Sequence, residues 1–209
     1  MFNLTLTVGK YEITPLFWAL ALAFVFSSFS MWKKMVKESY PEEDIFSTQI
    51  LMFLGGIALE MLFKRILGIT VFGAFLGVLL VSFWRFKVLE INTWEGFDCL
   101  TLPIIYFFFF GGIGLFLYTW QWTALGYSVT ASFGLGLYLF LKDRYRRFFW
   151  YKSGKTGFLF WSICFYLSAV LLVLDFVQTK KLYWSEVLWM ALLGVSAGAI
   201  YHRSELYKK

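Results

Sequence analysis

The sequence predicts an all-α, polytopic membrane protein built as a bundle of seven transmembrane helices, and three observations support this fold class. First, 60% of the 209 residues are hydrophobic and 23% are aromatic, whereas only 15% are charged. A soluble domain has roughly 25% charged residues, and a globule of this size has too much surface for so few charges. Second, long apolar runs alternate with short charged segments. Third, the Lys and Arg residues are distributed unevenly between alternate segments.

The apolar runs place the individual helices. A bilayer core of ~30 Å requires about 20 mostly apolar residues per helix. We expect spans at 16–32, 45–63, 69–84, 99–120, 122–141, 157–176 and 184–200, of which the third and seventh are short. The polar segments between them are too short to bury a core of their own. Residues 1–209 are therefore expected to form a single integral membrane domain, with the first span retained rather than cleaved as a signal peptide.

The basic residues predict the orientation of the bundle. One set of alternate segments has 14 Lys and Arg residues, and the other set has five. Because Lys and Arg accumulate on the cytoplasmic side, we expect the N-terminus outside, the C-terminus inside, and a multi-pass protein of the cytoplasmic (inner) cell membrane.

Small residues predict how the helices pack, and the scarcity of reactive side chains restricts the kinds of catalytic site that the chain can form. Glycines four residues apart, in GAFLG (73–77) and GVSAG (194–198), predict close helix packing. The two cysteines, Cys99 and Cys164, lie in or beside apolar runs, so no disulfide framework and no metal site is expected. The single histidine, His202, follows the last span. A general base within the bilayer would therefore be a carboxylate or a phenol.

Ionisable residues within the spans are costly and predict functional positions. Glu60 and Lys64 share a helical face at the i, i+4 spacing. One interpretation is a surface ion pair at the headgroup level. The other is that nearby cations hold the phosphate of an anionic lipid, which Glu60 or Asp175 orients. The candidate lipid-binding residues are Glu60, Lys64, Arg65, Asp175, Lys180 and Lys181. Asp98 is expected to be a structural carboxylate at a helix start.

The segment 142–155 combines six cations with several aromatic residues. Juxtamembrane cations are attracted to anionic lipid by about 1 kcal/mol each, and aromatic rings prefer the membrane interface. This segment is therefore interpreted as an inner-leaflet anchor, and no nucleic-acid binding is expected.

Several segments, in order, resemble the prolipoprotein diacylglyceryl transferase family. VFGAFLGVLLVSFWRFKVLEINTWEGFDCLTLPI resembles the family's HGGLIG motif with its following basic loop and Asp-x-x-x-Pro element. FFGGIGLF stands at the position of the GRxGNF motif, and GFLFWSICFYLSAVLLVLDFVQ at the position of a late family span. The matching structural positions are Gly73, Gly77, Asp98, Gly111 and Gly114. Phe72 stands in place of the motif histidine, Gly112 in place of the arginine, and Leu115 in place of the asparagine.

The resemblance implies a seven-span enzyme that transfers diacylglyceryl from phosphatidylglycerol to the lipobox cysteine of a lipoprotein precursor, without a cofactor. The implied partners are a phosphatidylglycerol-like phospholipid and the signal segment of a lipoprotein precursor. The alternative is a catalytically inactive relative that binds phospholipid or the precursor as a membrane scaffold or accessory protein. A transporter or channel is disfavoured, since no span has a run of polar residues or a broken helix at its centre.

Overall fold

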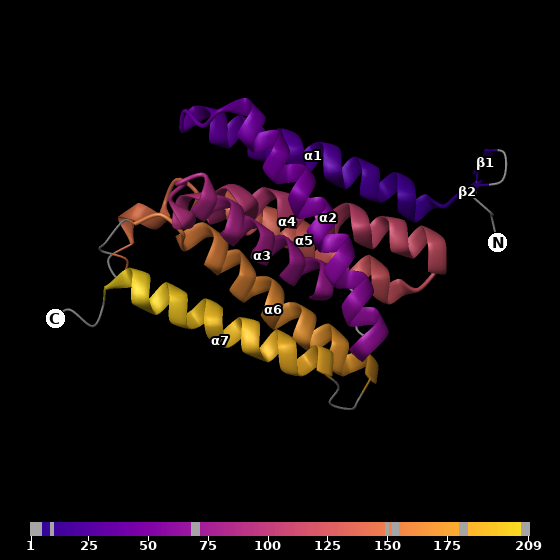
Figure 1. Ribbon diagram of the computed structural model, residues 1–209. Coiled ribbons are helices and arrows are strands. Elements are labelled where there is room, and N and C mark those ends of the chain that lie inside the picture. The colour runs from indigo at the N-terminus through magenta and orange to yellow at the C-terminus, as the bar shows by residue number, and fades with distance from the viewer. Residues whose placement is uncertain are drawn as a thin grey trace.

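The computed structural model describes residues 6–8, 11–67, 72–148, 151, 155–179 and 184–205, and it confirms an all-helical bundle (Figure 1). The helices are α1 (Pro15–Lys37), α2 (Glu42–Leu67), α3 (Phe72–Val88), α4 (Thr93–Thr119), α5 (Trp122–Leu141), α6 (Phe158–Thr179) and α7 (Trp184–Ser204). A short 3₁₀ helix, η1 (Tyr145–Arg147), follows α5. Each α-helix corresponds to one predicted span, and most ends differ from the prediction by a few residues.

Six of the α-helices are long and apolar enough to cross a membrane. The seventh, α3, has 17 residues, which at 1.5 Å per residue covers about 25 Å, somewhat less than a bilayer core. A feature that the sequence did not predict is a short antiparallel hairpin before α1, formed by β1 (Leu6–Val8) and β2 (Tyr11–Ile13). The hairpin and the end of α7 lie at opposite ends of the bundle (Figure 1).

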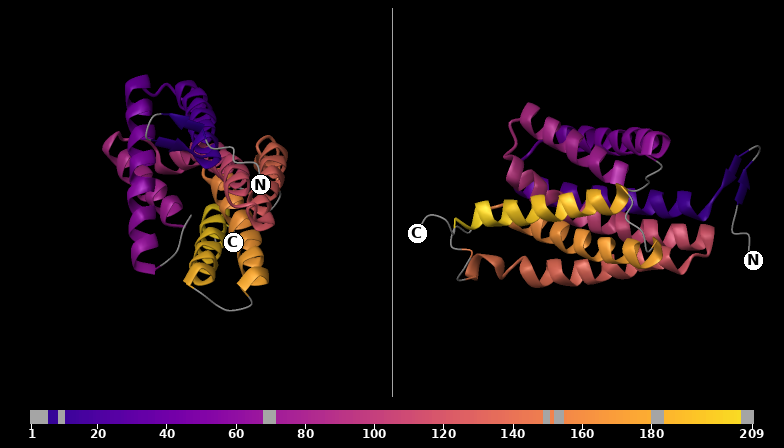
Figure 2. Two further views of the ribbon diagram at one scale, coloured as in Figure 1. Left: turned by 90° about the vertical axis from the view of Figure 1, so that its right-hand side faces the viewer. Right: turned by 90° about the horizontal axis from the view of Figure 1, so that it is seen from below.

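Helix α4 is the centre of the bundle. It is the most buried of the six long helices and packs against α1, α3, α5 and α6. Its sequence is apolar on all sides, which is the pattern of a fully surrounded helix. The α2–α3 pair stands to one side, while α5, α6 and α7 pack together on the other (Figure 2).

The GAFLG motif confirms the predicted close packing of two helices. A Cβ atom added to Gly77 would meet the backbone carbon of Gly55 at 2.9 Å and Gly56 Cα at 3.0 Å. At Gly73, an added Cβ would lie 2.8 Å from the backbone oxygen of Leu59. Between apolar helices in lipid, such close backbone approach supplies the packing energy that the hydrophobic effect does not. These two glycines therefore hold α3 against α2.

The GVSAG motif does not pack in this way, so the prediction of close helix packing is wrong for this motif. A Cβ added to Gly194 or Gly198 would meet nothing within 4 Å. Both glycines are exposed on α7, because α7 turns a different face, with the buried Trp189 and Ser196, toward the bundle.

These two motifs predict opposite effects of the same substitution. We expect Gly77→Ala to lower the free energy of unfolding by about 1–3 kcal/mol, since a backbone cannot yield to the new methyl group. We expect Gly198→Ala to be neutral or to stabilise the protein by up to about 1 kcal/mol, because alanine favours helix and meets no neighbour. Unfolding of the purified variants in mixed micelles measures both. Equal effects of the two variants would contradict the proposed α2–α3 contact.

Candidate functional site

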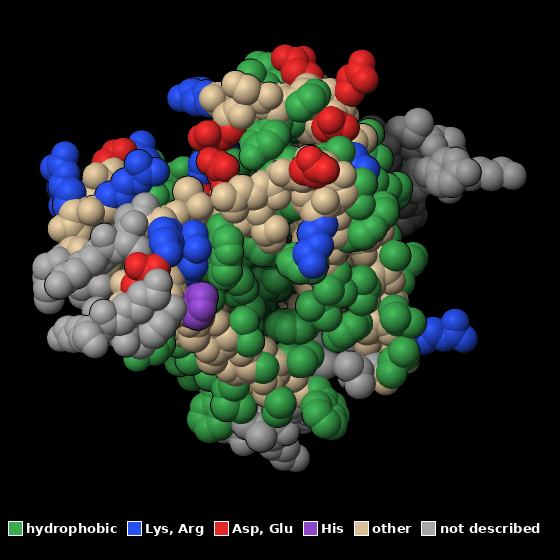
Figure 3. Space-filling model, turned by 60° about the vertical axis from the view of Figure 1, so that its left-hand side comes forward, with side chains coloured by type: hydrophobic (Ala, Val, Ile, Leu, Met, Phe, Trp, Pro, Cys, Tyr) green, Lys and Arg blue, Asp and Glu red, His purple; other side chains and the backbone are tan. Residues whose placement is uncertain are grey.

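A cavity of about 220 Å³ lies at one end of the bundle, where α1, α5 and α7 finish and α4 and α6 begin. We call this the cation-rich end, since Lys and Arg residues lie in the last turns of α1, α3 and α7 and in the segment just after α5. The residues lining the cavity are Lys34, Glu38, Glu95, Asp98, Tyr138, Lys142, Tyr145, Arg146, Thr156 and Leu159. Figure 3 shows acidic and basic side chains close together on this part of the surface, whereas other parts of the same face are hydrophobic.

Asp98 forms the base of the cavity and caps a neighbouring helix. Its side chain is only 4% exposed. Oδ2 accepts a hydrogen bond of 2.7 Å from the backbone N–H of Gly157, and Oδ1 accepts one of 3.0 Å from the N–H of Phe160. Gly157 immediately precedes α6 and Phe160 lies in its first turn, where the backbone N–H groups have no partner within the helix. The Asp98 carboxylate of α4 is therefore the N-terminal cap of α6, rather than of its own helix.

The backbone before α6 is shaped to meet this carboxylate. Gly157 has a φ angle of +98°, and a Cβ added there would lie 2.8 Å from Cε3 of Trp94. The positive φ angle and the nearby Trp94 ring therefore each exclude a side chain at this position.

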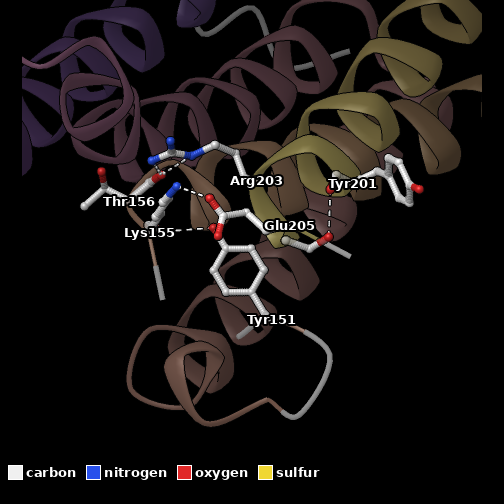
Figure 4. Close-up of polar contacts among 7 residues, drawn as sticks. Tyr151, Lys155, Thr156, Tyr201, Arg203 and Glu205 are labelled. Carbon is white, nitrogen blue, oxygen red and sulfur yellow. Dashed lines mark hydrogen bonds and ion pairs between the residues drawn. The ribbon is translucent and has the colours of Figure 1, made fainter. Parts of the chain in front are cut away.

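The end of α7 holds the same loop from the other side (Figure 4). Nε and Nη2 of Arg203 donate to the backbone oxygen of Thr156 at 3.1 and 2.7 Å, and the guanidinium lies 4.6 Å from the centre of the Trp94 ring. Lys155 forms an ion pair with Glu205. Thr156 thus reaches the cavity on a loop that is anchored to α4 and to α7.

Three cations surround the cavity. Lys34 Nζ donates to the backbone oxygen of Asp98 at 2.7 Å, which ties α1 to α4. Arg146 Nε donates to the Tyr145 hydroxyl at 3.1 Å. Tyr145 itself is buried and stacks on Phe158 of α6 with ring centres 5.3 Å apart. Lys142 ends α5 and is exposed.

Two carboxyl groups face these cations. Glu38, just after α1, and Glu95, in the first turn of α4, are in side-chain hydrogen-bonding contact. The Tyr40 hydroxyl donates to Glu95 Oε2 at 3.5 Å. Burial, and then the neighbouring Glu95 carboxylate, raise the pKa of Tyr40 above its usual value. The phenol therefore stays protonated and keeps its role as a donor to Glu95.

The described residues that the sequence singled out for lipid binding lie at the opposite end. Glu60 Oε2 accepts a hydrogen bond of 3.3 Å from the backbone N–H of Ala74, so the carboxylate faces the N-terminal turn of α3. Within the described residues Glu60 forms no ion pair with Lys64, contrary to one interpretation of their spacing. Lys64 and Arg65 are exposed, and Lys180 and Lys181 lie outside the described residues.

Asp175 is near the same end, in different surroundings. Its Oδ2 accepts a hydrogen bond of 3.2 Å from Trp189 Nε1, and Tyr127 also hydrogen-bonds to it. Glu186, which is completely buried in the first turn of α7, lies close enough to interact with this carboxylate. The sequence did not single out Glu186, because an acid in the first turn of a helix is common.

An aromatic cluster lies between Glu60 and Asp175. Phe72 packs edge-on against Trp189, with ring centres 5.2 Å apart, and Phe63 also contacts Phe72, with ring centres 6.5 Å apart. The cavity at the cation-rich end is lined by neither carboxylate, nor is the apolar groove between α5 and α6. The candidate lipid-binding residues are thus not brought into one described site.

The two remaining glycines at the family-motif positions, Gly114 and Gly111, differ in whether they contact another helix. An added Cβ on Gly114 would lie 3.1 Å from Leu16 Cα of α1, so this glycine permits close packing of α1 on α4. An added Cβ on Gly111 would meet nothing within 4 Å.

No protein-family model, curated protein or solved structure matches this chain.

The Asp98 cap predicts a large effect of a single substitution. Asp98→Ala leaves two buried backbone N–H groups at the start of α6 without an acceptor, so we expect the free energy of unfolding to fall by roughly 2–4 kcal/mol. Asp143→Ala is the matched control, since Asp143 is an exposed acid at the same end. Unfolding in mixed micelles measures both variants. A loss at Asp98 no larger than that of the control would contradict the capping role.

Proposed function

We propose that this protein is a multi-pass protein of the cytoplasmic membrane that binds the phosphate of a phospholipid headgroup in the cavity at the cation-rich end. It acts as a membrane scaffold or accessory protein. The observation that supports this most directly is the convergence of Lys34, Lys142 and Arg146 on one small cavity. A phosphate diester requires cations and hydrogen-bond donors, and the Tyr138 and Tyr145 hydroxyls add donors beside them.

The position of the cavity along the helices supports a headgroup as the ligand. It lies at the ends of apolar helices, where the basic residues are concentrated and where lipid phosphates are found. At ~30 Å³ per water molecule, the cavity has the volume of about seven waters. That is room for a headgroup, while the acyl chains remain in the bilayer. In the proposed orientation, with the C-terminus inside, the headgroup belongs to the inner leaflet.

The surroundings of the family-motif positions favour binding over transferase chemistry. Phe72, at the place of the motif histidine, is buried among Phe63, Phe75 and Trp189. Gly112, at the place of the arginine, packs on α5, where an added Cβ would lie 2.9 Å from the oxygen of Ala124. Diacylglyceryl transfer to a thiol requires a base and phosphate-binding cations at the reacting centre. These positions provide neither.

Removing the two peripheral cations tests the binding site. We expect the double variant Lys142→Gln/Arg146→Gln to bind short-chain phosphatidylglycerol roughly 30-fold more weakly, at about 1 kcal/mol for each cation. Lys33→Gln/Arg144→Gln is the control, because it removes the same charge from the same end without touching the cavity. Titration of the detergent-purified proteins gives the affinities. Equal weakening by both pairs would show a diffuse charge effect and would refute the site.

Complementation tests whether the protein is a transferase. We expect no thioether lipidation of a reporter lipoprotein when this chain is expressed in a transferase-depleted bacterium, because a base and cations are lacking at the family-motif positions. Insertion of the protein into the membrane is checked in the same cells. Lipidation of the reporter above the empty-vector level would instead establish the transferase.

A further inference from the structure

The acidic side of the cavity is unexplained by phosphate binding alone. Glu38 and Glu95 contact each other, and both line the cavity. Among the described residues, no Lys or Arg forms an ion pair with either carboxyl group. Lys34, one of the cations in the cavity wall, donates instead to the backbone oxygen of Asp98. Two carboxylates in contact repel each other, and a cation bound between them relieves this repulsion.

The position of Glu38 adds to this repulsion. It is the C-terminal cap of α1, where its backbone N–H bonds to the carbonyls of Met35 and Val36. The C-terminus of a helix carries partial negative charge, so a carboxylate there is unfavourable and a cation is favourable. The like-charged neighbour and the helix end therefore both favour a positive group at the same point.

The chemistry of the cavity identifies the kind of cation. No group of three or more metal-ligating side chains occurs in the part of the chain that the structure describes, and two carboxylates with a phenol are few ligands for a metal. An ammonium group, by contrast, needs only acceptors for its hydrogen bonds. The Glu38 and Glu95 oxygens provide these acceptors, and Lys142 and Arg146 provide a phosphate site in the same cavity.

We infer that the cavity selects a phospholipid with an aminoethyl phosphate headgroup, whose ammonium binds between Glu38 and Glu95 and whose phosphate binds Lys142 and Arg146. This inference rests on the proposed function and specifies its ligand. It explains why a cavity in a basic region has acids in its wall. A glycerol headgroup leaves the carboxyl pair without a cation, and a trimethylated amine has no N–H to donate.

Native mass spectrometry of the full-length protein, exposed to an equimolar mixture of phosphatidylethanolamine, phosphatidylglycerol and phosphatidylcholine, tests the selection. We expect the wild-type protein to retain phosphatidylethanolamine over the other two. Glu95→Gln and Glu38→Gln should each reduce this preference roughly tenfold, the scale of one hydrogen bond to a charged group. Glu43→Gln, an exposed acid at the same end that does not line the cavity, should leave it unchanged.

The variant Lys142→Gln/Arg146→Gln separates the two proposals. If it weakens retention of all three lipids while wild-type protein shows no preference among them, the phosphate site stands and the amine selection is overturned. If it weakens none of them, both proposals fail. Unchanged preference in both glutamine variants also overturns the amine selection, because the carboxyl pair then contributes nothing to the choice of headgroup.

Soluble phosphoethanolamine distinguishes a lipid from a free phosphomonoester. We expect it to displace phosphatidylethanolamine only at concentrations far above those of the lipid, since it has no acyl chains in the bilayer. Displacement at equal concentration would overturn the lipid as the ligand. The melting temperature of each glutamine variant is measured alongside, so that a loss of preference is interpreted only in folded protein.

Discussion

The cap that Asp98 provides for α6 is the contact on which the cation-rich end depends. Backbone N–H groups at a helix start cannot be left without acceptors where water is scarce. Here the acceptor comes from α4, 59 residues away from Gly157 in sequence. The same residue accepts from Lys34 of α1 through its backbone oxygen. One aspartate therefore fixes the relative positions of α1, α4 and α6, and with them the base of the cavity.

The loop before α6 connects these contacts to α7. Its tight backbone at Gly157 places Thr156 between the cavity and Arg203, and the guanidinium binds the Thr156 oxygen while lying on Trp94. At the opposite end, close glycine packing of α2 on α3 and an aromatic cluster at the α3–α7 contact have the corresponding role. Polar contacts thus organise the cation-rich end, whereas backbone packing and aromatic rings organise much of the other.

Much of the fold was predictable because hydrophobic length and charge are local properties of the sequence. All seven helices were expected, and α5 begins and ends at the predicted residues. Contacts between helices were harder to predict from the sequence. GAFLG and GVSAG have the same spacing, yet only GAFLG faces a neighbour, because the rotation of a helix is set by its packing and not by its glycines. The Glu38–Glu95 contact joins residues 57 positions apart, and no local pattern indicates it.

Some of the basic residues that predict the orientation also line the cavity. Lys34, Lys142 and Arg146 belong to the basic segments that predict the orientation of the chain in the membrane. A residue that only marks orientation needs to be basic and near the membrane, and any position in the segment suffices. These three instead line one cavity, together with three acids that would weaken a simple attraction to anionic lipid. Opposite charges placed this closely suit a ligand that is itself zwitterionic, and they make the cavity distinct from the general positive charge around it.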